Sequence, residues 1–198
     1  ILNNDTVVGE SFIEKLKLAL DNKIGVAGIA MEESDQISYA GKIDWLKPTL
    51  SHIHENPGDI NHYVIGGGLA VQREVFEKVG FLDEKYFLYF EDADWTLRVR
   101  RAGYQITFLT NICVRHAVSA STKKFGSPML LRYHYRNALY FNRKNGPWYV
   151  KILVWPWSWL IAVKQLSKIV LGKNREQSTA ILKGVRDWYM GRMGKIIS

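Results

Sequence analysis

Cysteine is almost missing from this chain of 198 residues, which contains only Cys113. A single thiol excludes an intrachain disulfide and a cysteine-based zinc cluster, and such sparse usage fits a reducing compartment. The sequence also has neither an initiator Met nor a basic leader before Ile1-Leu2, so nothing in it resembles a signal peptide. Because this apolar pair runs directly into the polar Asn3-Asn4-Asp5, we expect a fragment that begins at the end of a strand.

A long uninterrupted apolar run is missing as well. The stretch Trp148–Val163 is mostly apolar and rich in Trp, but Lys151 and Ser158 interrupt it. It is therefore too short and too interrupted for a membrane span. Tryptophans flanked by Lys and Arg suit the bilayer interface. The alternative is a helix packed on the rest of the protein with an ordinary solvated basic face.

Acidic residues are scarce in one half of the chain. Residues 115–198 carry 16 Lys/Arg and 2 Asp/Glu, a net charge of +14, whereas residues 1–114 carry 11 and 17, a net charge of −6. This asymmetry suggests two tasks in one chain. The basic half is also rich in Trp and Tyr and has no RNA-binding signature, so an anionic membrane surface is favoured over nucleic acid.

The order of the predicted elements indicates an α/β domain over residues 1–125 and a helical extension over 126–198. Hydrophobic residues make up 47% of the chain, which is enough for a core. Apolar periodicity and turn residues predict helices over 11–21, 73–79 and 92–102, and three helices from 128 onward, broken near 146–147 and 172–174. Strands are predicted over 24–30, 64–71 (with a loop), 106–109 and 112–114, and a hairpin pairs 37–39 with 43–45 across 40–42.

Three carboxylates crowd into Glu91-Asp92-Ala93-Asp94, directly after an aromatic run. Gathering them in a half-buried place is costly without a role. An ionised carboxylate at a helix N-terminus is favoured by the macrodipole and can serve as a general base. The alternative is that Glu91 or Asp92 caps the helix and Asp94 pairs with Arg98.

Three further segments could carry chemistry. Asn3-Asn4-Asp5-Thr6 places a carboxylate just beyond a strand end, where open α/β sheets bind ligands and where Asp5 could hold a divalent cation, although turn chemistry alone explains such a pair. Gly66-Gly67-Gly68 is either a flexible turn or a point of close ligand approach. His116 could ligate a metal or a diphosphate, or it could be a partly buried polar residue.

Taken together and in order, these segments resemble family 2 glycosyltransferases, in particular the bacterial rhamnosyltransferase-like branch. The resemblance covers roughly residues 1–125. It is carried by the segments 2–6, 66–76, 80–84, 90–98, 103–104 and 114–116. It implies the C-terminal part of a GT-A-type mixed sheet with helices, and transfer of a sugar from a nucleotide-diphosphate sugar to a hydroxyl acceptor with inversion, in bacterial surface polysaccharide synthesis.

The resemblance also implies roles for individual residues. Asp92 matches the catalytic base, which Glu91 would support. Asp5 stands at the metal-binding position for Mg or Mn, with His116 near the metal and the diphosphate. Gly67, Gly68 and Asp94 would serve substrate binding.

The same resemblance places the nucleotide-gripping half of the family before Ile1, so this chain alone is expected to be inactive. The expected partners are the donor sugar and a glycan or lipid-linked acceptor, with peripheral membrane contact through residues 146–198 at the cytoplasmic face and no nucleic acid. Two rival interpretations stay open: a metal-dependent phosphohydrolase that uses Asp5, Asp92 and His116, and an inactive basic fragment that binds membrane or RNA.

Overall fold

The computed structural model describes residues 1–3, 6–19, 24–33, 36–55, 57–58, 60–116 and 128–196. The chain divides into two compact units. The sheet unit comprises Ile1–Ile43, Leu50–Leu82 and Asp92–Lys123. The helical unit comprises Asp44–Thr49, Asp83–Glu91 and Lys124–Ser198, so it includes two segments from well before residue 126.

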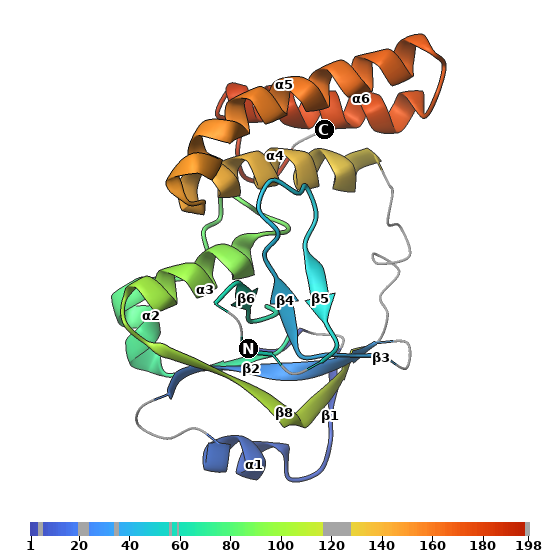
Figure 1. The fold of residues 1–198 in the computed structure, drawn as a ribbon. Helices are drawn as coiled ribbons and strands as arrows, with labels where there is room; N and C mark the ends of the chain where they lie inside the picture. Colours follow the sequence, from blue (N-terminus) through green and yellow to red (C-terminus); the bar gives the residue numbers. More distant parts are fainter. Residues whose placement is uncertain are drawn as a thin grey trace. The chain divides into compact units, whose positions relative to one another are not determined.

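A mixed sheet forms the centre of the sheet unit (Figure 1). Its strand order is β1-β8-β2-β3, and β7 also pairs with β2. Strands β2 and β8 are parallel, and the other pairs are antiparallel. The strands are β1 (Thr6–Val8), β2 (Ile24–Glu33), β3 (Gln36–Ser38), β7 (Leu69–Val71) and β8 (Gln105–His116). With six helices in the described residues, the chain is a mixed α/β structure, as the sequence predicted.

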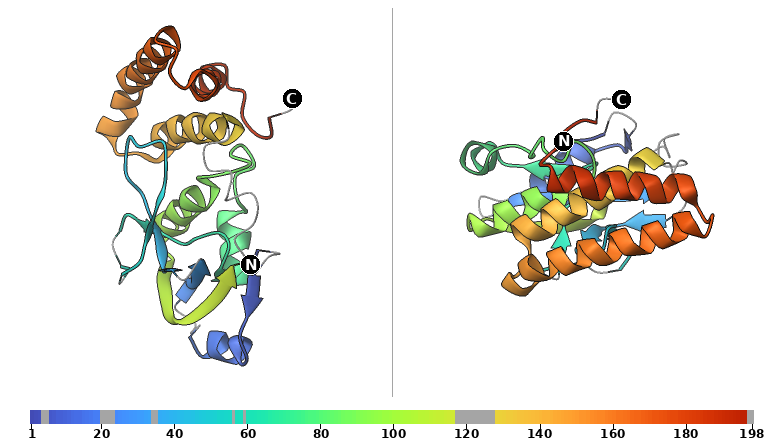
Figure 2. Two further views of the ribbon diagram at one scale, coloured as in Figure 1. Left: turned by 90° about the vertical axis from the view of Figure 1, so that its right-hand side faces the viewer. Right: turned by 90° about the horizontal axis from the view of Figure 1, so that it is seen from above.

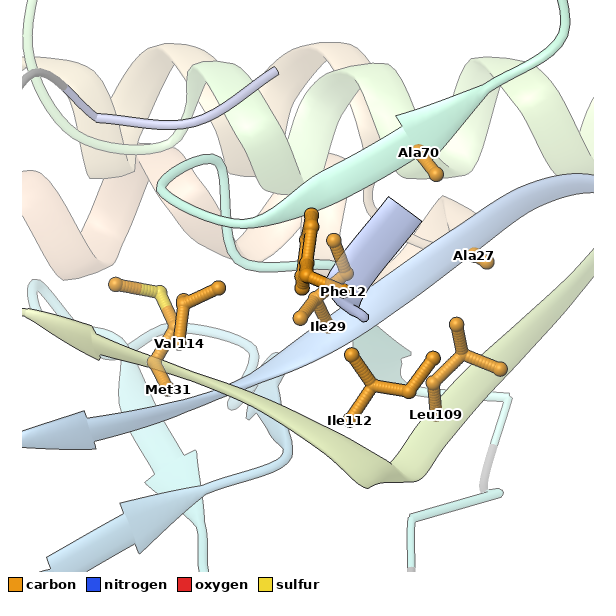
Figure 3. Close-up of a cluster of buried hydrophobic side chains, with 8 residues drawn as sticks. All are labelled: Phe12, Ala27, Ile29, Met31, Ala70, Leu109, Ile112 and Val114. Carbon is orange, nitrogen blue, oxygen red and sulfur yellow. The ribbon is translucent and has the colours of Figure 1, made fainter. Parts of the chain in front are cut away.

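Strand β2 is buried on both faces because alternate side chains enter different apolar clusters. Ala27, Ile29 and Met31 join Phe12 of helix α1 (Phe12–Ala19) in one cluster, which Figure 3 shows. Val26 joins the other cluster, together with residues of α2 (Arg73–Val79) and α3 (Glu91–Arg101). Burial on both faces explains why the sequence of β2 is a continuous apolar run rather than an alternating one.

The predicted hairpin across residues 40–42 is wrong. Ala40–Lys42 is itself a strand, β4, which lies between β5 (Ser51–Ile53) and β6 (His62–Tyr63) in a small second sheet. A Cβ on Gly41 would lie 2.0 Å from Cζ of Tyr63, so the Tyr63 ring fills the space of the missing side chain. Gly41 therefore marks a close approach within a strand and not a turn.

Residues 105–116 form one strand, β8, where the sequence predicted two. Its pairing with β2 shifts between Ile29, which is opposite Leu109, and Ala30, which is opposite Cys113. The extra residues form an irregularity of the bulge type, which bends the strand without ending it. The break that the sequence indicated near residue 110 is this shift in register.

The helical unit contains the three predicted C-terminal helices, α4 (Pro128–Asn145), α5 (Trp148–Val170) and α6 (Arg175–Tyr189), which pack side by side (Figure 2). They share a core of Leu139, Val154, Ile161, Ile181 and Val185. The breaks between them fall at the glycines that the sequence indicated, and Gly172 has a φ of 69°. In the part of the chain that the structure describes, none of the helices combines the length and apolar character that crossing a bilayer requires.

Candidate active site

The Asp92 carboxylate lies in the first turn of α3 and faces the glycine loop, which we define as Gly66–Gly68. Its Oδ2 atom accepts a hydrogen bond from the Gly66 N–H at 3.1 Å, and its Oδ1 atom accepts one from the Ala93 N–H at 2.7 Å. Asp92 therefore satisfies the N–H of the next residue in its own helix and also reaches a loop 26 positions earlier in the chain. These two bonds hold the carboxylate at the glycine loop.

Burial raises the pKa of Asp92 to about 6, against the lowering effect of the hydrogen bonds from Gly66 and Ala93. Burial is the larger cause because removing a carboxylate from water disfavours its charged form. A base is most effective when its pKa is close to the working pH, since it is then both deprotonated and basic enough to take a proton. This environment therefore suits Asp92 to proton abstraction near neutral pH.

The glycine loop is held closely on both sides. The Gly67 carbonyl accepts a hydrogen bond from the Asn3 N–H at 3.1 Å, and the Gly68 carbonyl accepts one from the Ile29 N–H at 2.9 Å. A Cβ on Gly67 would lie 2.7 Å from Cε of Met31 and 3.0 Å from Nδ2 of Asn3. No side chain fits at Gly67 without displacing these neighbours. The loop is thus a packed element between the first residues of the chain and β2, not a flexible turn.

Asn3 and His116 belong to backbone segments that come together at one edge of the sheet. The Asn3 carbonyl accepts hydrogen bonds from the N–H of Thr6 at 3.2 Å and from its hydroxyl at 2.7 Å. Thr6 in turn is opposite His116 in the antiparallel pair of β1 and β8. The chain therefore brings the residues on either side of Asn4-Asp5 next to the glycine loop and to the end of β8.

Asn4 and Asp5 lie outside the described residues, as does the side chain of His116. The predicted metal ligands Asp5 and His116 therefore stay predictions. Among the residues that the structure does describe, no group of three His, Cys, Asp or Glu side chains is arranged to hold a metal ion. The structure does show that Thr6, the residue after Asp5, is paired with His116 across β1 and β8.

Asp94 is completely buried and pairs with Arg98, whose Nε lies 3.0 Å from its Oδ2 atom. Arg98 also donates hydrogen bonds to the carbonyls of Val79 at 2.8 Å and Phe81 at 2.6 Å. The pair itself was predicted by the i, i+4 spacing, and its Arg98 ties α3 to the C-terminal end of α2 and to Phe81. These contacts give Asp94 a structural task, and its predicted part in substrate binding stays a prediction.

Glu91 is the first residue of α3 and is half-buried. Burial and the negative charge of Glu91 both raise the pKa of the Tyr89 hydroxyl, burial being the larger cause. The sequence analysis missed Thr96, whose hydroxyl accepts a hydrogen bond from the Val64 N–H at 3.2 Å and so fixes the backbone between β6 and the glycine loop. Its only sequence signal was its position four residues after Asp92, on the same side of the helix.

The chain is similar in sequence to two proteins named as rhamnosyltransferases. The chain is 30% identical over 155 residues to a dTDP-rhamnosyl transferase of Shigella flexneri, which covers 72% of this chain and 52% of the relative. It is 25% identical over 124 residues to an N-acetylglucosaminyl-diphospho-decaprenol L-rhamnosyltransferase of Mycobacterium tuberculosis, covering 62% and 40% respectively. No protein-family model matches the chain. The chain spans about half the length of the relatives, and the similarity supports a glycosyltransferase family.

Proposed function

We propose that this chain is the acceptor-side catalytic part of an inverting glycosyltransferase with a GT-A-type fold, which uses a nucleotide-diphosphate sugar as its donor. The observation that carries the proposal is the Asp92 carboxylate, held against Gly66 with a pKa raised to about 6. The names of the relatives make dTDP-rhamnose the first donor to test and a lipid-linked N-acetylglucosamine the first acceptor. A role in surface polysaccharide synthesis is part of this proposal.

In the proposed reaction, Asp92 takes the proton of the acceptor hydroxyl while the hydroxyl oxygen attacks the anomeric carbon of the donor sugar. The new glycosidic bond forms as the bond from the anomeric carbon to the diphosphate breaks, and the nucleotide diphosphate leaves with the electron pair. Attack on the side opposite the leaving group inverts the anomeric centre. The hydrogen bond from the Gly66 N–H to Asp92 supports this mechanism, because it holds the carboxylate beside backbone that carries no side chain.

A divalent cation, Mg or Mn, would be held by Asp5 together with His116 and would neutralise the charge of the leaving diphosphate. Support for the pair comes from Thr6, the residue after Asp5, which is opposite His116 across two antiparallel strands. The cation would then lie at the same sheet edge as Asn3 and the glycine loop.

We predict that Asp5→Ala in the complete protein abolishes the dependence of donor binding on the cation. Donor affinity measured by titration calorimetry with Mn present should fall by about 10- to 100-fold, since a ligating carboxylate is lost. With EDTA present, the variant and the wild type should bind the donor equally weakly. Glu10→Ala removes an exposed carboxylate from the same segment and is the matched control. Unchanged donor affinity in Asp5→Ala with Mn would overturn the metal assignment.

Dependence on the acceptor separates sugar transfer from the rival phosphohydrolase. We expect release of the nucleotide diphosphate from donor to require an acceptor hydroxyl and to rise at least about 100-fold when it is added, because the attacking oxygen must be positioned at the base. A phosphohydrolase would release product at the same rate without acceptor. Product release measured by coupled assay, with NMR of the anomeric configuration of the product, gives the two readouts.

The helical unit supports a second part of the proposal, contact with the cytoplasmic face of a membrane through residues 146–198. Helix α5 carries an apolar stripe along one face, at spacings of three and four residues. The stripe consists of Trp148, Ile152, Trp155, Trp159, Val163, Leu166 and Val170, whose exposed fractions run from 45% to 85%. The face of α5 that enters the core is different, and it carries Val150, Val154 and Ile161.

Charge and residue type favour a lipid surface as the occupant of this stripe. Lys151, Lys164 and Lys168 accompany it on the same helix, and the chain from residue 115 onward has 16 basic residues against 2 acidic ones. Tryptophan prefers the boundary between lipid and water, and Lys and Arg near that boundary attract anionic headgroups. A helix lying in the interface plane, and not across the bilayer, is consistent with the helix lengths described above.

A further inference from the structure

The segment that leads into the proposed base is a strained loop, residues 86–90, which we call the entry loop. Phe87, Tyr89 and Phe90 have φ angles of 61°, 67° and 75°, in the left-handed region that non-glycine residues avoid. This region is unfavourable for residues that have a side chain, so the conformation persists only where surrounding groups impose it. α3 begins at the next residue, Glu91, and Asp92 follows.

A single side chain, Asn137 of α4, binds the entry loop through its backbone. The Nδ2 amide of Asn137 donates to the carbonyls of Tyr86 at 2.9 Å, Leu88 at 2.6 Å and Tyr89 at 3.2 Å. An amide has two N–H groups, so the three carbonyls share them. Asn137 is completely buried, and the loop is therefore wrapped around one amide in the interior of the helical unit.

Arg136, the neighbouring residue, fixes the orientation of that amide. Its Nε donates to Oδ1 of Asn137 at 2.9 Å, which turns Nδ2 toward the entry loop. Its Nη2 donates to the Tyr86 carbonyl at 3.1 Å, and its Nη1 donates to the Arg192 carbonyl at 3.3 Å. A buried guanidinium that satisfies carbonyls and an amide oxygen gives the network a defined geometry.

Aromatic side chains of the entry loop pack along the same helix. Tyr89 stacks on His134 with ring centroids 3.8 Å apart, and the ring centroids of Phe90 and Phe141 are 5.3 Å apart. The loop is thus held by its carbonyls and by its rings, both against α4. We call these hydrogen bonds and ring contacts with α4 the clamp on the entry loop. They are more than a connection between two elements requires, and strained loops of this kind cluster at active sites.

We infer that Asn137, oriented by Arg136, is a positioning residue for the catalytic base: it holds the entry loop in its strained form and thereby fixes the first turn of α3. This inference rests on the proposed function, because it gives Asp92 the role of base. Asn137 acts through the backbone and does not touch the reacting groups. Losing its three hydrogen bonds would let the loop relax and would displace the turn that follows it.

The test compares Asn137→Ala with Asn142→Ala in the complete protein. Asn142 is on the same helix and equally buried, and among the described residues its Nδ2 atom has no hydrogen-bond partner. We expect Asn137→Ala to lower kcat about 100-fold, as a misplacement on the order of 1 Å can do, with donor KM changed less than about threefold. Asn142→Ala should leave both values close to those of the wild type.

A second readout does not depend on activity. The Asp92 carboxyl pKa, followed by carbon-13 NMR, should fall from about 6 toward the ordinary value in Asn137→Ala, because a loosened turn admits water. The same pKa in Asn137→Ala, Asn142→Ala and the wild type would overturn the inference. If Asn137→Ala does not fold, Arg136→Lys replaces it in both measurements. This variant keeps the positive charge but loses the hydrogen bond to Oδ1 of Asn137, and kcat and the Asp92 pKa decide in the same way. A wild type without sugar transfer would refute the proposed function, while the titration still tests the clamp.

Discussion

Asp92→Asn lowers kcat for sugar transfer by about 1,000-fold while donor affinity stays within about threefold of the wild type, because an amide cannot take the acceptor proton. The amide oxygen can still accept the hydrogen bond that the Gly66 N–H now donates to the carboxylate. The fold and the donor side of the site should therefore persist. Steady-state kinetics with a labelled donor, together with calorimetric donor binding, measure the two quantities.

Asp44→Asn is the matched control for this variant. Asp44 is partly exposed and pairs with Lys47, three positions along the chain, at 3.0 Å, so its loss should leave kcat unchanged. Turnover of Asp92→Asn close to that of Asp44→Asn would remove the base assignment. A fall in donor affinity equal to the fall in kcat would instead give Asp92 a binding role.

The pH dependence follows from the same carboxylate. Wild-type kcat should decrease as pH falls through about 6, since protonated Asp92 cannot act as a base. The residual turnover of Asp92→Asn should lack this decrease at low pH.

The stability of the fold depends on pH in the opposite direction. A carboxyl with a raised pKa in the folded state stabilises the fold below the unfolded pKa, and that contribution is lost as pH rises through about 6. Asp92→Asn should therefore lack this dependence of thermal stability on pH.

Local patterns predicted the helices well and the short strands poorly. Trp95 and Val99 are four residues apart and both are buried on one side of α3, so the periodicity alone identified that helix. Gly41 led to the wrong prediction of a hairpin turn because glycine occurs both in turns and where another side chain packs closely against the backbone. Only the Tyr63 ring, 22 positions further along the chain, decides between them, and that contact is invisible in a local window.

The candidate site was predicted only in part, because local patterns do not show contacts between residues that are distant in the sequence. The cluster around Asp92 was recognisable from its composition and from the family resemblance, and the structure adds its contact with Gly66. The clamp on the entry loop was not recognisable. An aromatic run predicts burial and not left-handed backbone, and Asn137 lies about 50 residues from the carbonyls that it binds. Polar residues inside a predicted helix were the only signal, and they did not indicate a partner.

Replacing Trp148 and Trp159 together by Glu should lower binding to anionic vesicles about 100-fold, because each buried Trp contributes at least about 1.5 kcal/mol and the new charges repel the headgroups. The two residues are 75% and 68% exposed and lie near one end and the middle of the stripe on α5. Flotation with vesicles of phosphatidylglycerol and phosphatidylcholine at low salt measures the partition.

Ser167→Glu with Thr179→Glu adds the same charge at one exposed and one half-buried position outside the stripe, so this double variant should lose only the small electrostatic part of binding. Equal losses in both double variants would mean that basic charge alone holds the protein to lipid. A wild type that stays unbound at low salt would exclude the membrane contact. In that case a change in molecular mass on substituting Trp148 and Trp159 would identify the stripe as a contact between copies of this chain.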